Sequence, residues 1–320
     1  MRFGFVCLVA AFWPALGWAQ FKAAPAEHGP RLEGQSTQRI KIGVIIKATG
    51  GTVQNVVATV PVPDEWPEQQ VRVVDEDIAP SYAKVDYRQI TGGGGVRQLV
   101  LKVPRLAAGL EARALITFEV TRRGWAAPAD TASYRIPQKL NRDLTIDLGT
   151  SPYIESRHPK IVAAAKAAVA DHEGAWEKAE AIYDWVREHV IYEENEEEEL
   201  KGAARALFDG DGGADEVVSV FIAMCRAQKI PARTVFVLGH CYAEFYLEDA
   251  SGQGHWFPCQ PAGVRAFGSI SNLNPILQKG DNFRNPEDRK ERLRYVTEYL
   301  NAAGRGKAPK VKFISELIAP

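Results

Sequence analysis

The side chains with the clearest consequences for chemistry lie at the start of one predicted helix. Residues 210–233, GDGGADEVVSVFIAMCRAQKIPAR, form a glycine-rich loop followed by an amphipathic run that begins at Ala214. The first turn of a helix stabilises an oxyanion and lowers the pKa of a thiol, because its N–H groups lack partners and the helix dipole is positive there. The position therefore suits a nucleophile, but the side chain of Ala214 is an inert methyl group.

A histidine and a polar partner lie downstream, in a predicted β-hairpin. Residues 240–260 contain two alternating runs on either side of the turn sequence DASGQG. A turn centred near residue 250 would place His240 opposite Gln260, and Glu244 opposite Trp256. Because side chains alternate along a strand, Tyr242 and Glu244 would share the face of His240. A helix-start residue, a histidine and an orienting side chain are the parts that nucleophilic catalysis needs.

The cysteines offer a disulfide but no substitute nucleophile. The same pairing would place Cys241 opposite Cys259 on the face away from His240, which makes them candidate disulfide partners in an oxidising compartment. Cys225 lies 11 residues into the predicted helix. At 1.5 Å per residue it is about 16 Å from Ala214 along the helix axis, so it cannot act at the helix start.

Three other polar patterns suggest ion or phosphate sites. In DGDGGADE, an EF-hand would need Asp or Asn at Gly213, glycine at Ala214 and glutamate at Val220, so calcium is not expected. TGGGG at Thr91–Gly95 precedes neither a lysine nor a helix, which favours a hairpin turn. The acidic run Glu193–Glu199 could attract calcium or a cationic partner, but such runs are more often solvated. We expect no metal and no cofactor.

Two periodicities divide the chain into an α+β protein of two domains. Six short alternating runs between residues 39 and 125 predict an antiparallel β-sandwich, immunoglobulin-like in its pattern. From about residue 150 to residue 320 the pattern predicts an α+β domain, with a surface helix at 286–304 and a final strand at 310–318. One helical stripe in this domain contains Trp176, Ala179, Ile182, Tyr183, Val186 and Val190.

The N-terminal residues predict export. MRFGFVCLVAAFWPALGWAQ has the form of a signal peptide cleaved near Ala19, followed by a linker at residues 20–38. Its apolar run is too short to span a bilayer core of about 30 Å, so we expect a periplasmic or extracellular protein that does not span a membrane. The 39 basic and 40 acidic residues give a net charge of −1, which offers no footprint for nucleic acid.

The combined motifs resemble the transglutaminase-like superfamily, whose fold is related to papain. CRAQKIPAR at 225–233, HCYAE at 240–244 and WFPCQ at 256–260 are similar to its core motifs. The resemblance covers residues 153–260 closely and implies a triad of cysteine, histidine and aspartate. His240 matches the histidine, whereas Gln260 replaces the aspartate and Ala214 replaces the cysteine. Lys229 replaces a glycine at the helix exit.

These departures leave three hypotheses. The first, which we favour because a methyl group cannot attack a carbonyl, is a pseudoenzyme whose cleft binds protein or peptide segments. Its candidate binding residues are Tyr242, Glu244 and Trp256. The second is an inactivated, Cys-to-Ala form of an active cysteine transglutaminase or peptidase that acts on protein amides. The third is an active hydrolase or acyltransferase that uses another residue as its nucleophile.

Overall fold

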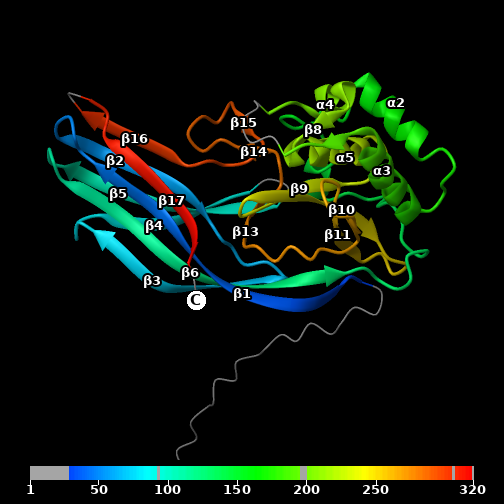
Figure 1. The fold of residues 1–320 in the computed structure, drawn as a ribbon, viewed down its shortest axis with the longest axis horizontal. Helices are drawn as coiled ribbons and strands as arrows, with labels where there is room; N and C mark the ends of the chain where they lie inside the picture. Colours follow the sequence, from blue (N-terminus) through cyan, green and yellow to red (C-terminus); the bar gives the residue numbers. More distant parts are fainter. Residues whose placement is uncertain (1–28, 92–93, 195–199, 305–306, 319–320) are drawn as a thin grey trace, which may run out of the picture.

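The computed structural model describes residues 29–91, 94–194, 200–304 and 307–318. The expected signal peptide at 1–19 lies outside the described residues, as do residues 195–199 of the acidic run and residues 92–93 of TGGGG. Within the described ranges, no helix is both long and apolar enough to cross a bilayer. The fold is α+β, with a long β-sandwich at one end and the helices gathered at the other (Figure 1).

All six predicted β-runs are strands, and they form the sandwich. One sheet has the order β17–β1–β6–β3, and in the second sheet β5 pairs with β4 and with β2, which pairs with β16. The alternating apolar residues of the two sheets meet in one buried core. The six strands are β1 (Arg31–Lys47), β2 (Val53–Val62), β3 (Gln69–Ala79), β4 (Lys84–Ile90), β5 (Gly95–Leu106) and β6 (Glu111–Ala126).

The predicted ends of the sandwich need two corrections. Strand β1 begins at Arg31, so the second half of the expected linker at 20–38 is strand. The surface helix expected at 286–304 is wrong, because this segment forms β15 (Arg292–Leu293) and β16 (Tyr299–Gly304). The final strand is confirmed as β17 (Lys310–Ile318), but it pairs with β1 while β16 pairs with β2. The C-terminal strands therefore complete the sandwich instead of the second domain expected at 150–320.

The second half of the chain packs helices on one face of a sheet (Figure 1). The predicted stripe on α3 is buried throughout, around a cluster of aromatic rings that includes Trp176, Phe245 and Phe257. The helices are α1 (Arg142–Ile146), α2 (Pro159–Ala168), α3 (Ala175–His189), α4 (Ala203–Asp209) and α5 (Ala214–Ala227). The strands are β7 (Ile191–Tyr192), β8 (Asp211–Gly212), β9 (Ala232–Val237), β10 (His240–Glu248), β11 (Gly254–Gln260) and β12 (Ala266–Phe267).

The two halves share one sheet. Strand β13 (Ile276–Lys279) pairs with β9 on one side and with the start of β5 on the other, where Gln278 faces Val96. A nine-stranded sheet therefore runs from β12 through β13 into the sandwich. Next to β13, β14 (Phe283–Arg284) pairs with β15 in a separate two-stranded sheet. The face of β10 turned away from the helices is consequently covered by the sandwich, which decides the environment of several predicted site residues.

Candidate functional site

Helix α5 begins at Ala214, as predicted. Gly213 is the N-cap, with φ of −71° and ψ of −177°, and the N–H of Val217 donates to its carbonyl at 3.1 Å. The Glu216 carboxylate accepts from the backbone N–H of Lys201 at 2.9 Å and fixes the first turn. A Cβ atom at Gly212 would lie 2.5 Å from the Cβ of Glu216, so the preceding loop needs glycine there. These contacts fix the first turn of α5, and the side chain that this turn carries at residue 214 is a methyl group.

The methyl group of Ala214 faces a cavity that also contains His240. The cavity has a volume of about 650 Å³, and His240, Cys241 and Asp215 are among its lining residues. Nε2 of His240 is buried and makes no hydrogen bond with the part of the chain that the structure describes. Burial lowers the pKa of His240, although the Asp215 carboxylate and a polar contact with Gln260 oppose this effect. Burial thus favours the neutral form of the imidazole.

The predicted register of the hairpin is wrong by two residues. Ala243, not Cys241, lies opposite Cys259, and Tyr246 lies opposite Trp256. The loop closes one residue later than expected because the Asp249 carboxylate accepts from the N–H groups of Ser251 and Gln253 and holds the turn. A shift of two residues keeps every side chain on its predicted face, since side chains alternate with period two.

Gln260 remains close to the histidine despite the changed register. Its side chain makes the polar contact that partly opposes the lowering of the His240 pKa by burial. Its backbone carbonyl accepts from the Tyr183 hydroxyl at 2.8 Å. The second bond ties the end of β11 to helix α3. The structure thus places Ala214 and His240 in one cavity and brings Gln260 into contact with His240.

The expected disulfide is not formed. Cys225, Cys241 and Cys259 are all free and buried. The two-residue shift separates Cys241 from Cys259 across the strands, which removes the geometry that a disulfide needs. Burial raises the pKa of the Cys241 thiol, and the neighbouring Asp215 carboxylate raises it further. Cys241 lines the cavity but is not an activated nucleophile.

Two of the three expected binding residues are buried and cannot contact a ligand. Tyr242 is 0% exposed, and its hydroxyl accepts from Arg122 at 2.9 Å. Glu244 is 1% exposed and forms ion pairs with Lys279 and Arg233. These two expectations are wrong because the sandwich, and not solvent, covers this face of β10. Trp256 is partly exposed, but it lines a second cavity that does not contain Ala214.

The ion pairs of Glu244 predict a specific dependence of stability on pH. Burial alone would raise the pKa of Glu244, but Lys279 and Arg233 outweigh it and lower the pKa from 4.5 to about 2. A lowered carboxyl pKa gives stability that is complete above the unfolded-state pKa and is lost as pH falls through the folded-state pKa. Between pH 5 and pH 2, this group should therefore remove on the order of 3 kcal/mol from the free energy of unfolding.

Urea unfolding of Glu244→Gln at a series of pH values measures this contribution. The variant should be less stable than the wild type near neutral pH, and its stability should fall less steeply with acid. Glu111→Gln is the control, because Glu111 is exposed and its carboxylate lies 3.7 Å from its basic partner Arg113. Parallel pH profiles for the wild type and Glu244→Gln would contradict the assignment.

Residues 162–261 match the family model described as the transglutaminase-like superfamily. These residues form a transglutaminase-like domain. The matched range runs from helix α2 to the residue after Gln260, so it includes all three positions at the end of the sheet. The predicted superfamily is confirmed for residues 162–261, and the predicted α+β fold is confirmed as well.

One solved structure shares this architecture, and a second is a more distant match. A candidate cysteine protease from Cytophaga hutchinsonii is 19% identical with a TM-score of 0.54, and the match covers 88% of this chain and 92% of that one. The periplasmic domain of TgpA from Pseudomonas aeruginosa is 12% identical with a TM-score of 0.35, covering 72% of this chain and 90% of that one. The first likeness shows a common fold. No curated protein matches this sequence.

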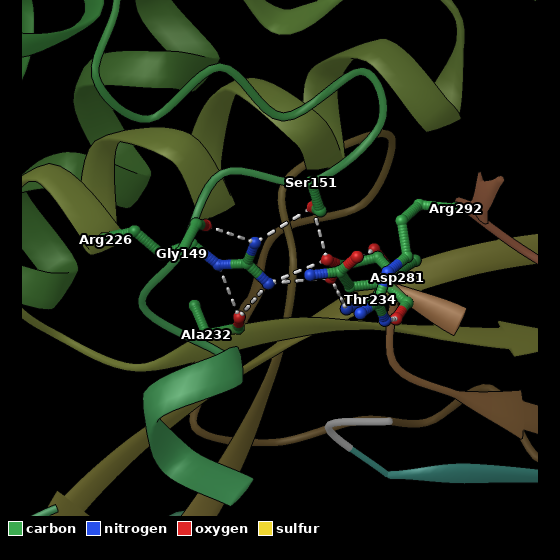
Figure 2. A network of polar contacts seen from close by, with 8 residues as sticks. Gly149, Ser151, Arg226, Ala232, Thr234, Asp281 and Arg292 are labelled. Atoms are coloured by element: carbon green, nitrogen blue, oxygen red, sulfur yellow. Dashed lines mark hydrogen bonds and ion pairs between the residues drawn. The ribbon is translucent and has the colours of Figure 1, made fainter. Parts of the chain in front are cut away.

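The arginine of the CRAQKIPAR motif has a structural role in the transglutaminase-like domain. The Arg226 guanidinium is fully buried and donates to both carboxylate oxygens of Asp281, at 2.8 and 2.9 Å. Figure 2 shows the same guanidinium donating to Ser151 and to backbone carbonyls, including that of Ala232. Asp281 also accepts from the Ser151 hydroxyl at 2.6 Å. The motif therefore fastens the end of helix α5 to β9 and to the loop after β13.

An ion pair at the start of α5 was not predicted from the sequence. Asp215 accepts from Nε and Nη2 of Arg294, at 3.1 and 3.0 Å, which holds the segment after β15 against the helix start. No sequence signal indicates this pair, since its members lie 79 residues apart. Lys229 has a φ of 64°, so the helix exit keeps the left-handed geometry that glycine favours.

In the described part of the chain, no group of three or more His, Cys, Asp or Glu side chains could hold a metal.

Proposed function

We propose that this protein is an exported pseudoenzyme that binds protein or peptide segments in the cavity at Ala214 and His240. The observation that carries the proposal is the methyl group of Ala214 at the start of α5, in a cavity with a histidine that has an unused Nε2. Acyl transfer through a covalent intermediate needs a nucleophile beside the base. The site keeps the base and the helix start, and it lacks the nucleophile.

The surrounding side chains support binding over catalysis. The three described thiols are buried, and burial raises the pKa of each of them. Tyr242 is buried on the other face of β10 from the helices, and burial raises its pKa as well. Glu244 is held by two cations. None of these groups is placed as an activated nucleophile toward a ligand in the cavity, which speaks against the reading as a hydrolase with a different nucleophile.

The charge of the lining indicates the segments that would bind. Glu193, Glu194 and Glu298 are among the residues that line the cavity, together with the basic residue Lys201. Carboxylates around a cavity favour a cationic side chain within it, because opposite charges attract and like charges are excluded. Among glutamine-bearing and lysine-bearing segments, we therefore expect the lysine-bearing ones to bind more tightly.

A binding measurement tests the proposed function. The probe is a fluorescein-labelled peptide with one lysine and one glutamine, followed by fluorescence anisotropy. Ala214→Phe should weaken binding at least about tenfold, since the ring would fill the cavity at the helix start. Ala167→Phe is the matched control, because Ala167 is an exposed alanine on helix α2. Equal affinity for both variants, or incorporation of an amine into casein by the wild type, would count against the proposal.

A further inference from the structure

A second cavity lies away from Ala214, where the sandwich meets the transglutaminase-like domain. Its volume is about 1140 Å³, and its lining includes the aromatic side chains Trp66, Tyr246 and Trp256. Trp66 comes from the segment before β3, whereas the other two residues come from β10 and β11. The Tyr246 and Trp256 rings are in contact edge to face, with centroids 5.2 Å apart. We call this cavity the arginine groove.

Cations dominate the groove although the whole chain is close to neutral. Six arginines and two aspartates line it, whereas the chain has a net charge of −1. One of the two aspartates, Asp147, is 2% exposed, and burial raises its pKa well above the usual range. The arginines are Arg88, Arg142, Arg233, Arg284, Arg289 and Arg292.

Only part of this charge is compensated within the protein. Arg233 pairs with Glu244 and lies over the Trp256 ring at 3.9 Å, and Arg88 pairs with Glu287. Arg142, Arg284 and Arg289 are exposed and form no ion pair with any residue that the structure describes. They come from α1, from β14 and from the loop after β14, so the fold brings together side chains that are distant in sequence. Grouping like charges costs free energy unless an anion joins them.

We propose that the arginine groove binds an acidic segment of a partner protein. A guanidinium binds a carboxylate with two parallel hydrogen bonds, so three uncompensated arginines suit closely spaced Asp or Glu side chains. Pockets for small ligands measure about 300–1,000 Å³, and this groove is larger than that range. The three aromatic rings offer apolar surface to the peptide side chains that lie between the acidic ones. Protein interfaces are commonly enriched in aromatic residues of this kind.

The remaining lining groups favour a peptide over a polyphosphate. Asn282 presents an amide group that matches the donors and acceptors of a peptide backbone, whereas the amides of Gln89 and Asn285 donate to Asp64 and Glu291. Asp143 is an exposed carboxylate within the groove, and it can accept from a backbone N–H of a peptide, a donor that a polyphosphate lacks. The chain also has a net charge of −1, whereas domains that bind nucleic acids are usually basic. This site is separate from the cavity at Ala214.

The test uses fluorescein-labelled octaglutamate and the full chain, with anisotropy read at low and at high salt. The wild type should bind this peptide and not octaglutamine, and binding should weaken as salt screens the charges. The double variant Arg284→Gln/Arg289→Gln should lose about tenfold in affinity, since two partly exposed ion pairs are removed. The matched control is Arg105→Gln/Arg157→Gln, which removes two exposed arginines outside the groove and should bind as the wild type does.

Several results would overturn the proposal. One is the absence of octaglutamate binding to the wild type. Another is an equal loss of affinity in the groove variant and in the control variant. A third is tighter binding of a single-stranded oligonucleotide or of a sulfated oligosaccharide than of octaglutamate, which would assign the groove to another class of polyanion. Circular dichroism of both double variants verifies that folding is unchanged, which exposed arginines permit.

Discussion

Ala214→Cys is expected to create a thiol that reacts with iodoacetamide near pH 6, where ordinary thiols are almost fully protonated. Helix-start N–H groups and a neighbouring histidine lower cysteine pKa values from about 8.5 to between about 3.5 and 7.5. Both are present at this position, because α5 begins at residue 214 and His240 lines the same cavity. A drop of two pKa units would raise the thiolate fraction at pH 6 about a hundredfold.

Two controls isolate the effect of the site. Ala167→Cys places an exposed thiol on helix α2 and should react at pH 6 only slowly. His240→Ala, added to Ala214→Cys, should raise the pKa of the new thiol and slow its alkylation. The native cysteines should contribute little, because burial raises the pKa of all three.

The activity of the same variant separates two of the hypotheses. Amine incorporation or peptide hydrolysis by Ala214→Cys would mean that the site is intact and only disarmed, as an inactivated form of an active enzyme requires. If the new thiol is reactive but the variant shows no turnover, Gln260 is the next residue to test. The reason is that an amide at this position cannot stabilise a protonated histidine by charge, whereas a carboxylate could. If Ala214→Cys is inert and Gln260→Asp does not restore activity, the cavity has diverged from catalysis and the binding function is supported.

Arg226→Met is expected to destabilise the protein by about 3–5 kcal/mol, the second large effect. Removing one member of a buried ion pair leaves the other charge without compensation. Both side chains are buried, with 0% exposure for Arg226 and 1% for Asp281. Burial alone would raise the pKa of Asp281, but Arg226 and the hydrogen bond from Ser151 outweigh it and lower the pKa. The variant would also lose the bonds that tie α5 to the Ala232 carbonyl.

Urea unfolding provides the measurement, and Arg205→Met provides the control. Arg205 forms an ion pair with Asp209 at 2.7 Å, but its side chain is 66% exposed, so the loss should stay below about 1 kcal/mol. Combining Arg226→Met with Asp281→Leu should recover part of the stability, because no buried charge is then left alone. A loss for Arg226→Met as small as that for Arg205→Met would show that the network is dispensable.

The sequence predicted most of the elements that position the site. Period-two alternation located the six strands of the sandwich, and helical spacing located the buried stripe of α3. The start of α5 at Ala214 followed from a glycine-rich loop before an amphipathic run. The faces of the hairpin were also correct, because an error of two residues in register leaves the alternation unchanged. These features depend on neighbouring residues, so local pattern was sufficient.

The sequence by itself determines that alanine occupies position 214 at the start of α5, where the resemblance implies a cysteine. Tertiary structure alone decided the rest: the pairing of β16 and β17 with the sandwich, the burial of Glu244, the free state of Cys241 and Cys259, and the arginine groove. Each depends on segments far apart in sequence, or on which layer covers a face. A periodic pattern in the sequence predicts whether a side chain points inward or outward, but it does not predict which residues of another segment pack against it.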